Sequence, residues 1–496
     1  MELAPKKLAY IGLICLALGF LFDYFFHNQT PGIAFVIYSG LLLAVFYLLA
    51  KHLKISFYKP TDRALKLLVL PIVFFSAMLA VRDSHFLVFW NVVATFGLLL
   101  VFAGYATGSS LGNYRIIDFL ITAFILPLKF IGSAFVSLGR LVLIKKHFSN
   151  TGKAPQIIKG IAITLPILFL FLLLLSSADL VFHKLLADLF NWQINIESFA
   201  FWLRVLFVAF IWLGTYSYLF QKSSPAAVPV PVKESAYTFG KIETQILLGS
   251  INALFLIFVI IQIGYLFAGS NAIAKLGYTY AEYAHKGFAE LIVVALVSFV
   301  IVFLSDKFTE KKDQKHTQSF KVLSAILVGL LMVIMASAFM RLALYEQAYG
   351  FTLLRLLVQS FIVWLSLIFL LLYYKIFKFL PESFFSFWSL MLVIAFFVFW
   401  NILNPDLFIA RQNISQFAAT NQLDTAYLSS LSADATPAIV ELLDKPDLKD
   451  KWGIALPQKA KEILLQKFNY LEKAQSWQSF NISRNKALNL ITGGGE

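Results

Sequence analysis

The chain of 496 residues is 59% hydrophobic and only 14% charged, and its formal net charge is +14. A soluble globule of this length needs more polar side chains to cover its surface, so the composition excludes a wholly soluble protein. Lipid is therefore the expected solvent for most of the chain.

Continuous apolar runs recur along the chain up to residue 403. A bilayer core takes roughly 20 helical residues, and continuous rather than alternating runs favour helices over a β-barrel. We therefore predict an all-α, polytopic integral membrane helical bundle of about 11 spans over residues 1–403. The predicted spans lie near residues 8–26, 32–50, 64–81, 85–107, 158–178, 198–220, 242–268, 287–305, 319–340, 351–374 and 382–403.

Basic residues at the ends of these spans indicate the orientation. Lys6 and Lys7 precede the first run, and no small-residue cleavage site follows it, so we expect a retained first helix and a cytoplasmic N-terminus. Most lysines and arginines of residues 1–403 then fall in cytoplasmic loops, where anionic headgroups on the inner face of the lipid bilayer are the expected partners. The net charge needs no nucleic acid as a partner, and the predicted location is the cytoplasmic membrane.

The segment 115–149 decides the number of spans. Residues 116–138 are apolar enough to cross the membrane, but Pro127 and Lys129 interrupt them. A crossing would also place the basic cluster that begins at Arg140 on the outer side, against the positive-inside rule. We therefore expect an interfacial or re-entrant pair of helices over 115–149.

Two later segments divide the chain further. A proline-rich stretch within residues 221–240 predicts an inner linker between two groups of spans. Residues 404–496 lack long apolar runs and predict a C-terminal helical tail, which is extracytoplasmic if the number of spans is odd.

The tail carries its own helix signals. The pairs Asn404-Pro405 and Thr436-Pro437 are typical of helix N-termini, because asparagine and threonine side chains cap helices and proline is favoured at the first helical position. A stripe of apolar residues at spacings of three and four follows, formed by Ala460, Ile463, Leu464, Phe468 and Leu471. This stripe needs a partner, which is either a neighbouring tail helix or the surface of the membrane domain.

Motifs of a soluble-type active site are missing from the sequence. Residues 108–113 are rich in glycine and serine but lack the Gly-Lys-Ser/Thr ending of a phosphate-binding loop. The seven histidines never pair at metal-ligand spacing, and the one cysteine, Cys15, lies in mid-span, where packing is its expected role. We expect no catalytic residue, no cofactor and no metal.

Polar side chains gather instead near the predicted outer ends of the later spans, most densely between Arg341 and Arg355. One interpretation is that they are interfacial anchors, since tyrosines and long basic side chains favour the headgroup region. The other is a polar pocket or ion-pair network that joins these spans to the tail. The candidate residues of this outer polar cluster are Tyr280, Glu282, Tyr283, Lys286, Glu290, Arg341, Tyr345, Glu346, Tyr349, Arg355, Asp406, Arg411 and Asn413.

Several blocks of sequence resemble a bacterial membrane family catalogued as domain of unknown function 4173, which is related to family 4153. The similar blocks cover residues 278–291, 341–355, 404–413, 423–434 and 477–484, in that family's order. The resemblance covers roughly the last half of the chain. It implies a multi-pass integral membrane protein and no assigned activity, and it indicates Tyr280, Glu282, Lys286, Arg341, Glu346, Arg355, Asp406 and Arg411 as positions to test.

Three classes of function follow from these features. The first is a non-enzymatic membrane protein whose outer tail docks on the ends of the eighth to tenth spans and serves sensing, assembly or scaffolding, with an unidentified protein partner for the tail. The second is a transporter or permease of a small solute or lipid, although paired broken helices are missing. The third is a membrane-embedded enzyme that modifies lipids or glycans, which would need carboxylates converging on a groove.

Overall fold

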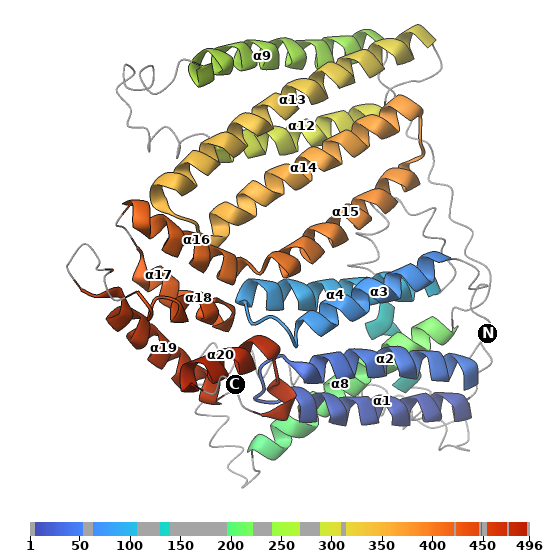
Figure 1. Ribbon diagram of the computed structural model, residues 1–496. Helices are drawn as coiled ribbons and strands as arrows, with labels where there is room; N and C mark the ends of the chain where they lie inside the picture. Colours follow the sequence, from blue (N-terminus) through green and yellow to red (C-terminus); the bar gives the residue numbers. More distant parts are fainter. Residues whose placement is uncertain are drawn as a thin grey trace, which may run out of the picture.

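The computed structural model describes most of the chain, in segments that cover residues 5–52, 63–106, 129–138, 196–221, 241–267, 288–308, 314–420, 423–445, 448, 454–473 and 476–493. All elements within these segments are helices (Figure 1), as predicted for the all-α class. Long helices lie side by side in one large bundle, and shorter helices of the tail cover one end of it. We call this end the tail side and the opposite end the far side.

Seven of the described helices are long and apolar enough to cross a membrane, which makes the protein an all-α polytopic membrane protein. They cover Lys6–Phe26, Ile33–His52, His85–Phe102, Ala200–Leu219, Thr317–Gln347, Leu353–Lys378 and Glu382–Leu403. Shorter apolar helices cover Leu68–Met78, Lys129–Leu138, Gln245–Ile260 and Val294–Asp306. The predicted total of about 11 spans stays a prediction, because residues 158–178 lie outside the described part.

The first group of helices forms the lower half of the bundle in Figure 1. Its members are α1 (Pro5–Phe26), α2 (Ile33–His52), α3 (Arg63–Met78), α4 (His85–Ala106) and α8 (Ile196–Gln221). A small residue lets α1 and α8 approach closely, because a Cβ on Gly19 would lie only 2.3 Å from the Val205 carbonyl oxygen. Near their tail-side ends, Arg204 of α8 pairs with the buried carboxylate of Asp23.

The helix at residues 129–138 packs against this first group. A Cβ on Gly214 of α8 would lie 2.1 Å from the Phe130 carbonyl oxygen, so the two backbones touch. Phe130 is buried beside Phe46 and Leu219 at the far side. The rest of the segment 115–149 lies outside the described residues, as does most of the linker 221–240, so the interfacial interpretation and the linker both stay predictions.

The second group of helices forms the upper half of the bundle in Figure 1. Its members are α9 (Lys241–Phe267), α12 (Phe288–Phe308), α13 (Gln314–Tyr349), α14 (Leu353–Lys378) and α15 (Glu382–Leu403). Phe320, Phe369 and Phe385 lie in its apolar core. At the far side, Lys375 Nζ donates to Asp306 Oδ2 at 2.5 Å, and this pair is buried between α14 and α12.

A pair of amides joins the two groups. Asn91 of α4 and Asn401 of α15 are fully buried and donate to each other, with N···O distances of 2.9 Å and 2.8 Å. Inter-helical hydrogen bonds of this kind hold membrane helices together where hydrophobicity cannot. The amide pair therefore fixes α15 beside α4.

The dense polar stretch that begins at Arg341 is helical in the structure. The sequence placed a span end near residue 340, but α13 continues to Tyr349. The helix ends where Gly350 adopts φ +77°, a left-handed conformation that glycine takes without steric cost. Thr352 then caps α14, because its side chain accepts a hydrogen bond from the Arg355 amide.

The tail is a compact set of short helices at one end of the bundle. They are α16 (Pro405–Thr420), α17 (Thr425–Ser430), the 3₁₀ turn η2 (Ala433–Ala435), α18 (Thr436–Val440), α19 (Leu456–Lys473), the 3₁₀ turn η3 (Trp477–Ser479) and α20 (Ile482–Thr492). One helix begins at Pro405, as predicted, and another at Thr436, one residue before the predicted start at Pro437. The expected side-chain caps are wrong: the Asn404 Oδ1 and Thr436 Oγ1 atoms have no hydrogen-bond partner among the described residues.

The apolar stripe of α19 packs mainly on other tail helices. Leu456, Ala460, Ile463 and Leu464 share one buried cluster with residues of α16 and α18. The same cluster includes Leu87, Leu356 and Trp400 from the membrane helices α4, α14 and α15. Tail and bundle therefore share one hydrophobic core, which answers the question of the partner that the sequence left open.

Candidate functional site

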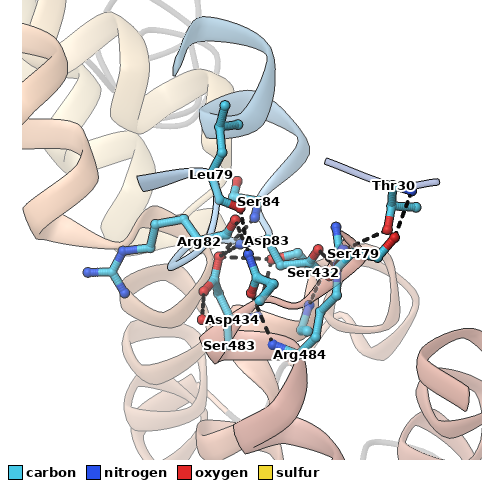
Figure 2. Close-up of polar contacts among 12 residues, drawn as sticks. Thr30, Leu79, Arg82, Asp83, Ser84, Ser432, Asp434, Ser479, Ser483 and Arg484 are labelled. Carbon is cyan, nitrogen blue, oxygen red and sulfur yellow. Dashed lines mark hydrogen bonds and ion pairs between the residues drawn. The ribbon is translucent and has the colours of Figure 1, made fainter. Parts of the chain in front are cut away.

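The most heavily connected polar cluster lies where the tail meets the turn between α3 and α4 (Figure 2). Arg484 of α20 donates from Nε to Asp83 Oδ1 at 2.6 Å, and both side chains are nearly inaccessible. Its Nη1 also donates to Thr30 Oγ1 at 2.6 Å and to the Ser479 carbonyl oxygen at 3.1 Å. One guanidinium thus joins the α1–α2 turn and the α3–α4 turn to the tail.

A second carboxylate makes the reciprocal connection. Asp434 Oδ2, in the turn η2, accepts hydrogen bonds from the amides of Asp83 at 2.9 Å and Ser84 at 2.8 Å. In return, Asp83 Oδ2 accepts from the Ala433 amide at 3.2 Å. Ser483 donates to the other oxygen of Asp434. Each segment therefore satisfies backbone groups of the other.

Asn481 satisfies carbonyl groups in the turn that follows α3. Its Nδ2 donates to the carbonyl oxygens of Leu79 at 3.0 Å and Arg82 at 2.9 Å. These carbonyls lie outside the helix ladder and need a donor from elsewhere, which the Asn481 side chain supplies. The Arg82 side chain extends away from this cluster (Figure 2) and donates to the Asn401 carbonyl oxygen at 2.9 Å.

The turn between α1 and α2 is bound to the tail through both backbone and side-chain hydrogen bonds. The Ile33 amide donates to the Phe480 carbonyl oxygen at 2.9 Å, and the Thr30 amide donates to Ser479 Oγ at 3.1 Å. A Cβ on Gly32 would lie 2.6 Å from the Ser479 carbonyl carbon, so only glycine fits this close approach.

Burial controls the electrostatics of this interface. Burial raises the pKa of Asp83, although the Arg484 guanidinium acts in the opposite direction. Burial likewise raises the pKa of Asp434 against the hydrogen bonds it accepts from Ser483 and from the amides of Asp83 and Ser84. The carboxylates are costly to bury and are held by specific donors, as expected for charges removed from water.

A small cavity of about 210 Å³ lies beside this network, between the α3–α4 turn and α19. Lys467 lines it together with Asp83, His85 and Tyr470. The Lys467 ammonium donates to the carbonyl oxygens of Ser429, Leu431 and Ser432 near the end of α17. Burial lowers the pKa of Lys467, whereas the charges of Asp406 and Asp83 raise it.

The turn between α13 and α14 makes a second polar contact with the tail. Asn413 of α16 accepts from the Phe351 amide at 2.6 Å and donates to the Phe351 carbonyl oxygen at 2.9 Å. The Tyr427 hydroxyl accepts from the Leu353 amide at 2.8 Å. The turn that follows the polar end of α13 is therefore held by α16 and α17.

Four predicted residues of α13 and α14 meet beside this turn. The Arg355 guanidinium carbon lies 4.3 Å from the centre of the Tyr345 ring, a cation–π contact. Its Nη1 also donates to the carbonyl oxygens of Tyr349 at 3.1 Å and Gly350 at 2.5 Å. Glu346 is 1% exposed and interacts with Arg355 and Gln359. These contacts close the end of α13 onto the start of α14.

The structure divides the predicted outer polar cluster. Tyr345, Glu346, Tyr349, Arg355 and Asn413 gather around the α13–α14 turn, and Arg341 lies further back on α13. Asp406 belongs to the Asp434 network instead, because its Oδ2 accepts from the Ser432 amide at 3.0 Å. Arg411 belongs to neither cluster: it makes an exposed pair with Glu441 at 3.5 Å.

The remaining candidates cannot be placed with these. Tyr280, Glu282, Tyr283 and Lys286 lie outside the described residues. Glu290 lies on α12, and its side chain is also outside the described part.

The sequence interpretation missed the residues with the most contacts, which are Asp434, Lys467, Asn481 and Arg484. Asp434, Asn481 and Arg484 do lie in blocks that carry the family resemblance. Nothing in the local sequence pairs them with Asp83, which is 401 positions before Arg484. Lys467 lies beside the apolar stripe of α19, where a lysine is normally solvated.

The carboxylates of this interface already accept hydrogen bonds, which limits the chemistry that they can perform. Asp83, Asp406 and Asp434 approach one another, but each accepts a backbone amide hydrogen bond. Among the described residues no group of three or more His, Cys, Asp or Glu is arranged to hold a metal ion. The cluster therefore has the properties of a buried structural contact that holds the tail on the bundle.

The fold and this buried contact define a class of protein: an all-α polytopic membrane protein whose helical tail is docked on the ends of its membrane helices. The chain belongs to the family described as Domain of unknown function (DUF4153), whose model matches residues 69–442. The sequence had indicated family 4173 and the related family 4153, and the match is to family 4153. It begins in α3, well before the last half of the chain. Neither a curated protein nor a solved structure matches the chain.

Proposed function

We propose that this protein is a non-enzymatic scaffold of the bacterial cytoplasmic membrane, whose tail is held permanently on the outer ends of the membrane helices and serves assembly or sensing there. Membership in the narrower family 4173 is part of this proposal. In this proposal a partner protein binds the surface of the tail, and the position of that surface relative to the membrane is constant.

The observation that carries the proposal is the Arg484 guanidinium bound to Asp83 and Thr30. Burying an ion pair costs desolvation, so such a pair is weak evidence for stability alone and is better suited to specifying one arrangement. Here it specifies how α20 lies on two turns of the first helix group. A tail meant to detach or rearrange freely would be joined to the bundle by exposed ion pairs, and not by a pair whose side chains are 8% and 2% exposed.

The orientation of the proposal rests on the positive-inside rule. Lys6, Lys7, Lys51, Lys321 and Lys378 lie near the far-side ends of their helices. Loops rich in lysine and arginine favour the cytoplasmic side, so the far side is assigned to the cytoplasm and the tail to the outside. Labelling of a cysteine at position 444 in the tail with a membrane-impermeant reagent on intact cells tests this assignment.

The scaffold role is tested by native electrophoresis of mildly solubilised membranes after chemical cross-linking. We expect the native chain in an assembly larger than the monomer, Arg484→Met to lose it, and Arg411→Met to keep it. Migration of the native chain as a monomer before and after cross-linking would contradict the proposal.

The buried pair of Lys375 and Asp306 favours a second candidate function, a transporter. Charged residues inside a membrane bundle are costly and often mark a solute or ion pathway. Reconstituted native protein should then carry a solute across liposomes, and Lys375→Met or Glu346→Ala should abolish the flux. The scaffold proposal expects no flux above that of empty liposomes.

The third alternative, a lipid- or glycan-modifying enzyme, receives less support. It needs carboxylates that converge on an open groove with lone pairs available for substrate. Glu346 and Asp406 have different partners, and the carboxylates that do converge already accept backbone amides.

A further inference from the structure

Three apolar side chains of the tail are exposed next to the membrane helices. They belong to Trp477, Phe480 and Ile482, which are 48%, 46% and 51% exposed. We call these three residues the tail edge. Single exposed apolar residues are common on proteins, but three within six positions of a well-packed segment form a patch that calls for a partner.

The position of Trp477 shows how deep this edge lies. Its ring centre is 6.2 Å from that of Tyr24 and 5.9 Å from that of Phe25. Both residues belong to the last turn of the candidate span Lys6–Phe26. A side chain of the tail thus lies level with the last turn of a candidate membrane-crossing helix.

Backbone contacts hold the rest of the edge at the same level. Phe480 accepts a hydrogen bond from the amide of Ile33, the first residue of α2. The Ile482 amide donates to the Ala80 carbonyl oxygen at 2.8 Å, just after α3. The edge therefore cannot move away from the helix ends without breaking these bonds.

The exposed edge is continuous with a surface that faces lipid. Tyr24 is 58% exposed on α1, and the same helix exposes Tyr10 and Leu13. Tryptophan, tyrosine and phenylalanine are the side chains that favour the boundary between headgroups and acyl chains. A lipid surface matches both the chemistry of the edge and its depth.

We propose that Trp477, Phe480 and Ile482 insert into the interfacial layer of the bilayer on the tail side, beside the ends of α1, α2 and α3. The tail then binds lipid as well as the helix ends. This goes beyond the scaffold role, because a transporter or an enzyme with this fold would have the same lipid contact.

Site-directed spin labelling in liposomes tests the proposal. Cys15 is first replaced by alanine, and single cysteines are introduced at Trp477, at Phe480 and at the matched control Leu465, which is 63% exposed on α19. We expect labels at 477 and 480 to collide more with oxygen, which dissolves in the bilayer, than with a water-soluble nickel complex. The label at 465 should show the reverse preference.

Labels at 477 and 480 that prefer the nickel complex as the 465 label does would overturn the proposal. Protection of 477 and 480 from both reagents would also overturn it, because it would indicate a second copy of the chain on the edge. A measurement on the native chain avoids any folding defect: a carbene precursor dissolved in the bilayer should modify the peptide with residues 476–482 at least several-fold more than the peptide around Leu465. Equal modification would contradict the proposal.

Discussion

Arg484 and Asp83 lie 401 positions apart in the chain and form a buried ion pair of 2.6 Å between the tail and the α3–α4 turn. Thr30 Oγ1 accepts a hydrogen bond from the same guanidinium, so the α1–α2 turn, the α3–α4 turn and α20 meet at one side chain. Such a contact makes docking of the tail cooperative, because losing it leaves charge buried on both sides.

Replacing Arg484 with methionine should release the tail. The change leaves the Asp83 carboxylate buried without its cation, and breaking a buried pair in this way costs about 3–5 kcal/mol. Hydrogen exchange of the α20 amides in nanodiscs measures the free energy of opening.

The matched control is Arg411→Met. Its pair with Glu441 is solvent-exposed on both sides, and such pairs contribute about 0–1 kcal/mol. Equal exchange of α20 in the two variants would show that the buried pair does not hold the tail.

Acidification should strengthen docking before it damages the fold. Burial raises the pKa of Asp83 and of Asp434 above the ordinary value of 3.8. Between 3.8 and the raised folded pKa, the folded state binds more protons than the unfolded state, so the free energy of unfolding rises as pH falls through that interval. Lys467, whose pKa is lowered, acts in the opposite sense, between its folded pKa and 10.5 on the alkaline side.

Thermal unfolding of the tail at a series of pH values below neutral, at constant ionic strength, measures this dependence. Asp434→Asn keeps an oxygen for the amides of Asp83 and Ser84 but removes the titration, so its dependence should be flatter than that of the native chain. A native tail that loses stability steadily from pH 7 downward would refute the expectation.

Alanine at Gly32 should disturb the contact between the α1–α2 turn and the tail. The added Cβ would lie 2.6 Å from the Ser479 carbonyl carbon and 2.7 Å from the Phe480 carbonyl oxygen, both of which are backbone atoms. Overpacking of this kind costs about 1–3 kcal/mol. Faster hydrogen exchange of residues 476–482 is the expected result.

Gly40→Ala on α2 is the control for this substitution, because no atom lies within 4 Å of a Cβ there. A helix interior even favours alanine over glycine by about 0.5–1 kcal/mol. The steric explanation fails if Gly40→Ala and Gly32→Ala speed exchange of the tail equally.

Aspartate at Asn413 should loosen the α13–α14 turn. The new side chain can still accept from the Phe351 amide, but it loses the donor to the Phe351 carbonyl oxygen and places a charge beside it. An unmatched buried polar group costs about 1–3 kcal/mol. Protease cleavage near residue 350 should become faster, while Ser415→Ala on the exposed side of α16 should leave the rate unchanged.

The local features of the fold were predictable from the sequence for a clear reason. Hydropathy over windows of about 20 residues depends only on neighbouring side chains, and it predicted the helical class and a distinct tail after residue 403. The helix starts at Pro405 and beside Pro437 were predictable as well, because proline restricts its own backbone. The caps were not, since Asn404 takes a left-handed conformation with φ +53° that closes α15.

The candidate site was predictable only in part. The polar stretch from Arg341 to Arg355 stands out because polar residues are rare between apolar runs. Asn413, another predicted member, binds the Phe351 backbone within this stretch. Asp83, Asp434 and Arg484 form the stronger cluster, yet each is ordinary in its local sequence. Their importance comes from distance and burial, which neither spacing nor composition encodes.

By itself, the sequence determined that this protein is helical, lies in a membrane and carries a polar tail, because the solvent preference of each segment depends on its own side chains. Only the tertiary structure decided that the tail closes over the ends of the first helix group through Arg484, Asp83 and Asp434. The physical reason is that a buried charge is tolerated only where partners surround it, and those partners come from segments up to 454 positions apart.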